Sequence, residues 1–254
     1  PVRPSIIWCD SRAVGEGQKI YQAIGAQKCQ NQILGSPGNF TASKLKWVME
    51  NEPGLYKRVK YFMLPGDYIV FKLTGEITTT INGLSEAILW DFKSNSSADW
   101  LLDYFGIDKN FIPRVVNNFQ EQGRINKKAS EESGLPFNIP LKYRAGDQPN
   151  NAFSLNVLNP GEIAATAGTS GVLFSLTDSL KTNEISRINH FAHVNYTKKS
   201  TIVGKLLCIN GTGIQYKWLR EITNEKEYYK MNKILNDVPV GCEGLINFPF
   251  GNGA

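Results

Sequence analysis

Residues 146–172 contain two turns built from small residues, Gly146-Asp147-Gln148 and Thr166-Ala167-Gly168-Thr169-Ser170-Gly171. The first turn follows a short strand-like run and places a carboxylate where a helix is expected to begin. The second turn joins two apolar runs, residues 162–167 and 172–176, which predicts a β-hairpin. Strands that feed helices through glycine-rich turns are typical of an α/β domain.

Asp147 is the candidate catalytic residue of the first turn. An alcohol hydroxyl is a poor nucleophile at neutral pH, so enzymes that phosphorylate one commonly use a carboxylate to accept its proton. Gln148 adds an amide that can bind a hydroxyl, and Gly146 allows a ligand to approach closely. A helix N-cap is the ordinary role of an Asp at such a position, and this alternative stays open.

Two glycine turns are candidates for binding a nucleotide. Gly168-Thr169-Ser170-Gly171 offers backbone N–H groups and two hydroxyls, which suit phosphate oxygens. Gly211-Thr212-Gly213 follows a predicted strand, residues 201–209, and precedes a predicted helix, so it could lie against a nucleotide. A plain hairpin turn and a packing turn are the alternatives. Neither turn has the Gly-x-x-x-x-Gly-Lys-Ser/Thr pattern of a P-loop.

A second cluster of candidate ligand-binding residues lies near the start of the chain. Residues 5–9 are predicted to form a strand, and Trp8 near its end would present a flat apolar face to the C–H groups of a sugar. Asp10 and Arg12 would supply hydrogen bonds at the turn that follows. The alternative is a core Trp beside an exposed ion pair.

The composition excludes several classes of protein. The chain has 254 residues, of which 41% are hydrophobic and 20% charged, as in an ordinary globular protein. Its net charge of +5 comes from 28 basic residues interspersed with 23 acidic ones, which argues against nucleic-acid binding. The 4 cysteines lie far apart, so we expect neither a zinc site nor a disulfide framework, and we expect a cytoplasmic location. No apolar run is long enough to predict a membrane span.

Helix caps and apolar periodicity divide the chain into two parts. The predicted helices span residues 10–25, 40–51, 65–73, 97–105, 129–133 and 147–156. Residues 111–140 are polar and turn-rich, as a connector between domains would be. We therefore predict a first domain over residues 1–139 and a second over residues 140–254.

Several motifs, in this order, resemble those of the FGGY carbohydrate kinases. The motifs that carry the resemblance lie at residues 3–12, 40–53, 64–75, 146–148, 166–171 and 244–250. The similarity is greatest to the bacterial branch of the family that acts on xylulose. It implies two actin-like, ribonuclease-H-like domains that close over a cleft. Sugar would bind mainly to the first domain, and ATP with Mg²⁺ mainly to the second.

The resemblance also implies roles for the candidate residues. Asp147 would be the base, with Gln148 beside it on the sugar, and Trp8 would line the sugar pocket near Asp10. Gly168 to Gly171 would face the ATP phosphates. The nucleoside would lie near Gly211 and Thr212, and no protein residue of this chain is assigned to the metal.

The chain departs from the family pattern at both ends. The Asp-x-Gly-Thr phosphate motif of the family would precede Pro1, and the glycine-rich adenine-binding segment would follow Ala254. We therefore expect both domains to be incomplete. We also expect this piece alone to be inactive or nearly so, while the complete protein phosphorylates D-xylulose to D-xylulose 5-phosphate.

Three alternatives remain at this point. The substrate could be another ketose or polyol of the kind the family accepts: ribulose, fuculose, rhamnulose, gluconate or glycerol. The protein could be a noncatalytic sugar-binding relative. The oligomeric state stays open, with a homodimer as one candidate, because apolar surface exposed on an incomplete domain can drive association that the complete protein does not show. A hydrolase that uses Ser170 with His190 or His193 is remote, because the Gly-x-Ser-x-Gly spacing is missing.

Overall fold

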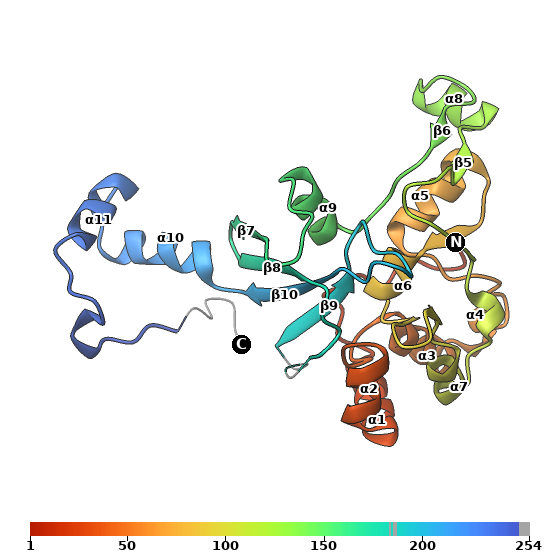
Figure 1. Ribbon diagram of the computed structural model, residues 1–254, viewed down its shortest axis with the longest axis horizontal. Helices are drawn as coiled ribbons and strands as arrows, with labels where there is room; N and C mark the ends of the chain where they lie inside the picture. Colours follow the sequence, from red (N-terminus) through yellow and green to blue (C-terminus); the bar gives the residue numbers. More distant parts are fainter. Residues whose placement is uncertain (183, 185–186, 249–254) are drawn as a thin grey trace.

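The computed structural model describes residues 1–182, 184 and 187–248. A four-stranded sheet lies at the centre of the molecule, with most of the helices on one side of it (Figure 1). On the opposite side, α10 (Thr212–Ile222) and α11 (Tyr228–Leu235) extend away from the sheet as an arm. The end of the last family motif, Pro249-Phe250, lies outside the described residues.

The central sheet confirms the predicted hairpin. Its strands are β7 (Ile163–Ala167), β8 (Gly171–Thr177), β9 (Ile188–Ala192) and β10 (Val203–Ile209), in the order β7-β8-β10-β9. All three neighbouring pairs are antiparallel, and Ala167 pairs with Gly171 across the hairpin turn. The sequence did not predict β9, whose polar Asn189 and His190 interrupt the apolar pattern of a strand.

The helices of the first part occur close to their predicted positions. They are α1 (Val14–Ile24), α2 (Ala26–Gln32), α3 (Thr41–Asn51), α4 (Pro53–Tyr56), α5 (Pro65–Thr74), α6 (Ile81–Glu86), α7 (Asp99–Phe105) and α8 (Lys127–Ser133). Gly75 and Gly106 end α5 and α7 in the left-handed conformation, as predicted for helix C-caps. The sequence did not predict α2, α4 and α6 as separate helices.

Short strands and turns connect these helices. β1 (Thr78–Thr80) runs parallel to β4 (Arg114–Val116), β2 (Trp90–Asp91) pairs with β3 (Ser96–Ser97), and β5 (Gly123–Arg124) pairs with β6 (Pro140–Leu141). In the described residues, η1 (Lys109–Phe111) and η2 (Cys242–Gly244) are short 3₁₀ turns. Residues 111–140, predicted to be a connector, therefore contain β4, β5 and α8.

Three local expectations were wrong. Residues 5–9 are irregular rather than a strand, because the Ile7 carbonyl accepts from the Asp10 N–H at 3.2 Å and from Lys44 Nζ at 2.7 Å. The sequence predicts side-chain caps at residues 10–12 for α1 and at a Thr or Ser for α3, but the N-cap residues are Ala13 and Phe40, and neither makes a side-chain cap hydrogen bond. α9 (Asp147–Ser154) begins after the N-cap Gly146, so Asp147 is the first helical residue rather than the cap.

One continuous core joins the two parts of the chain. Phe174 and Leu176 of β8 belong to the same buried cluster as Leu84 of α6 and Leu102 of α7. Buried hydrogen bonds reinforce this contact, because Asn82 Nδ2 donates to the carbonyls of Ala192 and His193 at 2.9 and 2.7 Å. The sheet therefore packs directly on α6.

Phe174 tests this arrangement, because its ring is 1% exposed in the shared core. We expect Phe174→Ala to lower the free energy of unfolding by about 3–5 kcal/mol, since it leaves a cavity between the sheet and the helices. Leu173, the neighbouring residue, is 43% exposed, so Leu173→Ala should cost about 1 kcal/mol or less. Urea unfolding of the two variants measures both values, and equal costs would contradict the shared core.

Candidate active site

Asp147 lies exposed at the first position of α9, with Gln148 directly against it. The Gln148 backbone N–H donates to Asp147 Oδ1 at 2.9 Å, and Gln148 Nε2 donates to Oδ2 at 3.1 Å. The structure therefore brings together the predicted base and the predicted sugar-binding amide, and leaves the carboxylate accessible.

Glu86, the last residue of α6, supports the residue before the candidate base. Its Oε1 accepts a hydrogen bond from the Gly146 N–H at 3.0 Å. The contact is so close that a Cβ at position 146 would overlap the carboxylate, which explains the glycine there. Sequence reasoning missed Glu86, although an acidic residue within the apolar run of residues 84–92 was a signal that it has a buried role.

Burial raises the pKa of Glu86 to about 7. The Gly146 N–H opposes this rise, while the nearby charges of Asp147 and Asp67 add to it. Burial also raises the pKa of Tyr143 to about 12, with the Glu86 charge as a second cause. Strongly shifted titratable groups are concentrated at functional sites, so this cluster supports a site around Asp147.

A buried ion pair holds the same segment against α5. Arg144 Nε lies 3.2 Å from Asp67 Oδ1, and both side chains are less than one-tenth exposed. Arg144 Nη2 also donates to Thr78 Oγ1 at 3.2 Å, and Asp67 Oδ2 accepts from the Leu64 N–H at 3.3 Å. Burial raises the pKa of Asp67 and lowers that of Arg144, and their mutual attraction opposes both shifts. Arg144 and Gly146 are thus both anchored to helices of the first part.

The two glycine turns predicted to bind nucleotide lie against each other. The Thr169 carbonyl accepts from the N–H groups of Gly213 and Ile214 at 3.1 and 3.3 Å. A Cβ at Gly213 would overlap the Gly168 carbonyl, so only glycine permits this approach. The hairpin turn therefore satisfies two of the free donors at the start of α10, and Thr212 and Gly171 lie at the same contact.

Within the hairpin turn, the Gly168 N–H donates to the Ser170 carbonyl at 3.0 Å. This donor is therefore already used inside the turn, in contrast to the expectation that each successive N–H is available to phosphate. Gly168 and Thr169 are exposed, while Ser170 and Gly171 are partly buried. Gly211 is buried and forms the N-cap of α10, and the adjacent Thr212 is exposed.

Trp8 and Asp10 lie in the irregular segment before α1. The Trp8 side chain is 88% exposed, so it is not the core residue of the alternative interpretation. Asp10 binds Arg12 through Nε at 2.9 Å and Nη2 at 2.7 Å, and this hydrogen bonding lowers the pKa of Asp10. The Arg12 guanidinium lies 4.7 Å from the centre of the Trp47 ring. The alternative of a core Trp beside an exposed ion pair is therefore met only in part. The Asp10–Arg12 ion pair is present, but the Trp8 ring is exposed to solvent.

The hydrolase alternative has no support in the geometry. His190 and His193 are 3% and 0% exposed, and burial lowers the pKa of each to about 4. Within residues 1–182, 184 and 187–248, no hydrogen bond joins either ring to Ser170. The same described residues contain no group of three or more His, Cys, Asp or Glu side chains that could hold a metal.

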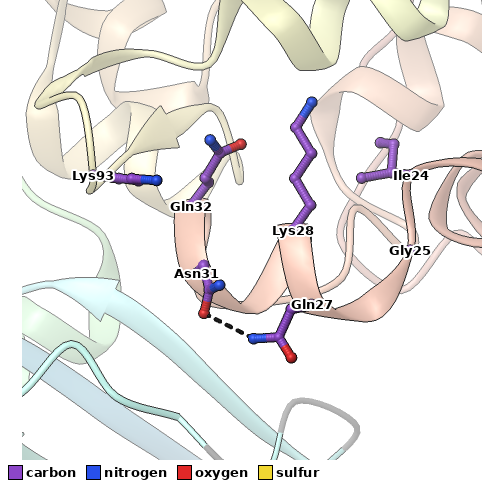
Figure 2. Close-up of a pocket in the computed structure, with 7 residues that line it drawn as sticks. All are labelled: Ile24, Gly25, Gln27, Lys28, Asn31, Gln32 and Lys93. Carbon is purple, nitrogen blue, oxygen red and sulfur yellow. Dashed lines mark hydrogen bonds between the residues drawn. The ribbon is translucent and has the colours of Figure 1, made fainter.

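A separate hollow of about 390 Å³ lies where α1 meets α2. Figure 2 shows its lining, which includes Lys28, Asn31 and Lys93, with Gln27 Nε2 donating to Asn31 Oδ1 at 3.1 Å. None of its lining residues is a candidate site residue. In the described part of the chain, no helix has the length and apolarity that a bilayer crossing requires.

Comparison with known proteins decides the family. Residues 1–154 match the model of the N-terminal domain of the FGGY family of carbohydrate kinases. The chain belongs to this family. It is 29% identical over 255 aligned residues to a xylulose kinase of Staphylococcus xylosus, covering 98% of this chain and 51% of that protein. The chain thus spans about half the length of the curated relatives it matches.

Solved structures show the same fold. The chain matches the crystal structure of xylulose kinase from Rhodospirillum rubrum with a TM-score of 0.88 at 21% identity, covering 99% of this chain and 51% of that one. It matches Plasmodium falciparum glycerol kinase with ADP with a TM-score of 0.80 at 17% identity, covering 95% of this chain and 50% of that one. The predicted fold class, an α/β actin-like kinase with partial domains, is confirmed.

The raised pKa of Glu86 predicts a pH-dependent stability. The folded chain holds this proton more tightly than the unfolded chain, so stability falls as pH rises from 4.5 through about 7. The shift corresponds to about 3 kcal/mol. Glutamine does not titrate, so Glu86→Gln should lose this part of the decline. The free energy of unfolding of the variant minus that of the wild type should therefore be more favourable at pH 8 than at pH 5. Urea unfolding of both proteins at the two pH values measures this difference in unfolding free energy. The same difference at pH 5 and pH 8 would contradict the prediction.

Proposed function

We propose that the complete protein containing this chain is an ATP-dependent carbohydrate kinase, with D-xylulose as the first-choice substrate and D-xylulose 5-phosphate as the product. The single observation that carries the proposal is the exposed Asp147–Gln148 pair at the start of α9, in a chain of the FGGY family. The xylulose kinases among its relatives support the choice of sugar.

Asp147 would act as the general base. Its carboxylate accepts the proton of the sugar hydroxyl while the hydroxyl oxygen forms a bond to the γ-phosphorus of ATP and the bond to the ADP oxygen breaks. The products are the sugar phosphate, ADP and a protonated Asp147 that later releases its proton to solvent. Gln148 would orient the sugar by a hydrogen bond, and Trp8 and Asp10 would contact the sugar when it is bound.

The turn of residues 168–171 would face the phosphates of ATP through its remaining backbone N–H groups and the hydroxyls of Thr169 and Ser170. Gly211 and Thr212 would lie near the nucleoside. Mg²⁺ usually binds through substrate phosphates and one or two carboxylates, so the lack of a larger acidic cluster in the described residues is compatible with it. We also propose a cytoplasmic location and a homodimer, and we expect little activity from this piece alone.

Asp147→Asn in the full-length protein tests the proposed base. We expect kcat to fall by about 10²–10⁴-fold, because the amide cannot accept the proton, while the KM for sugar changes little. Asp103→Asn is the matched control, since Asp103 is exposed on α7 and outside the candidate site. A coupled assay of ADP release measures both variants, and an active Asp147→Asn enzyme would exclude the base. A sugar-binding relative without catalysis would show no activity in the wild type either.

The substrate is tested by the same assay with a panel of sugars. We expect D-xylulose to give the highest kcat/KM among D-xylulose, ribulose, fuculose, rhamnulose, gluconate and glycerol. A higher value for any other member would replace xylulose in the proposal and leave the kinase activity intact. Binding without ADP release across the whole panel would favour a noncatalytic protein.

A further inference from the structure

We propose that Glu86 is a positioning residue for Asp147, which holds the start of α9 and places a second negative charge beside the base. The inference rests on the proposed role of Asp147 in the kinase reaction. It adds a residue from α6, outside the family motifs, to the machinery around the sugar hydroxyl.

Geometry is the first argument. Glu86 Oε1 binds the Gly146 N–H at 3.0 Å, and residue 146 is bonded directly to the candidate base. The absence of a Cβ at Gly146 lets the carboxylate occupy the space next to the backbone. Movement of Glu86 would therefore shift the residue that sets the position of Asp147. Displacement of a catalytic group by 1 Å is enough to cost about 10²-fold in rate.

The packing of α6 makes this support rigid. Asn82 of the same helix donates two buried hydrogen bonds to the carbonyls of Ala192 and His193. Ser85 Oγ accepts from the Ala192 N–H at 2.7 Å, one residue before Glu86. Glu86 is therefore attached to a helix that is fixed on β9, and α9 takes its position from that helix.

Charge is the second argument. The titratable groups that face Glu86 are Asp67 from α5, Tyr143 from the segment before α9, and Asp147 at the first position of α9. The Arg144 guanidinium in this cluster is paired with Asp67. An ionised Glu86 therefore places a second negative charge close to Asp147, and it accepts the Gly146 N–H more strongly than a neutral carboxyl does. A protonated Glu86 lacks this effect.

The sign of the pH dependence follows from these contacts. Since burial raises the pKa of Glu86 to about 7, the group gains its charge as pH rises through neutrality. The hydrogen bond from the Gly146 N–H then becomes charge-assisted and holds the start of α9 more firmly. We expect the kcat of the full-length enzyme to rise with pH around 7 for this reason.

The experiment measures kcat and KM of the full-length enzyme from pH 5.5 to 9, for the wild type, Glu86→Gln and Glu86→Asp. Glutamine keeps an acceptor for the Gly146 N–H but carries no charge. We expect Glu86→Gln to lose the inflection near pH 7 and to have a kcat about tenfold lower at pH 8, with an unchanged KM for sugar. Aspartate keeps the charge but is one methylene shorter, so Glu86→Asp should lower kcat and keep an inflection.

Glu76→Gln is the matched control, because Glu76 is an exposed acid paired with Arg114 away from α9. Its pH profile should equal that of the wild type. A Glu86→Gln profile identical to the wild type, or a change in KM alone, would overturn the positioning role. Circular dichroism shows whether Glu86→Gln folds. If it does not, Glu86→Asp is the deciding variant, and a kcat equal to that of the wild type would overturn the positioning role. An inactive wild type would instead refute the proposed function, and the inference with it.

Discussion

The hydrogen bond between the Glu86 carboxylate and the Gly146 N–H is the contact on which the candidate site depends. It joins the end of α6 to the beginning of α9, and the Asp67–Arg144 ion pair attaches the same segment to α5. Removing one partner of a buried polar pair is strongly destabilising, because the other group is left without compensation. The buried Asp67 and the partly buried Glu86 therefore hold the segment that leads to the exposed Asp147.

The two glycine turns, residues 168–171 and 211–213, are held together in a similar way, by backbone hydrogen bonds instead of charges. The Thr169 carbonyl accepts hydrogen bonds from two backbone N–H groups in the first turn of α10. These bonds hold the hairpin turn against the start of the helix. Two turns that are separated by β8, β9 and β10 in the chain are thereby brought together by the antiparallel pairing of β8 with β10. A glycine at position 213 is necessary, because any side chain there would push the turn away.

Sequence patterns predicted the elements whose signals are local. α5 begins at Pro65 and has Gly75 as its C-cap, and the hairpin of β7 and β8 follows its apolar runs. The strand predicted over residues 5–9 is not formed, and the Ile7 carbonyl accepts hydrogen bonds from Lys44 and from the Asp10 N–H instead. The apolar pattern of a strand does not reveal such contacts. The Asp147–Gln148 pair was predictable because the two residues are adjacent. Glu86 was not, since it lies 60 residues from Gly146 in the chain.

The attachment of α6 to β9 limits how the molecule can bend. Separating them would break the two hydrogen bonds of Asn82 and the one to Ser85, at a cost of about 1 kcal/mol or more each. The hairpin strand β7 lies at the opposite edge of the sheet from β9. Bending of the molecule that preserves these hydrogen bonds therefore has to occur within the sheet, away from the contact between α6 and β9.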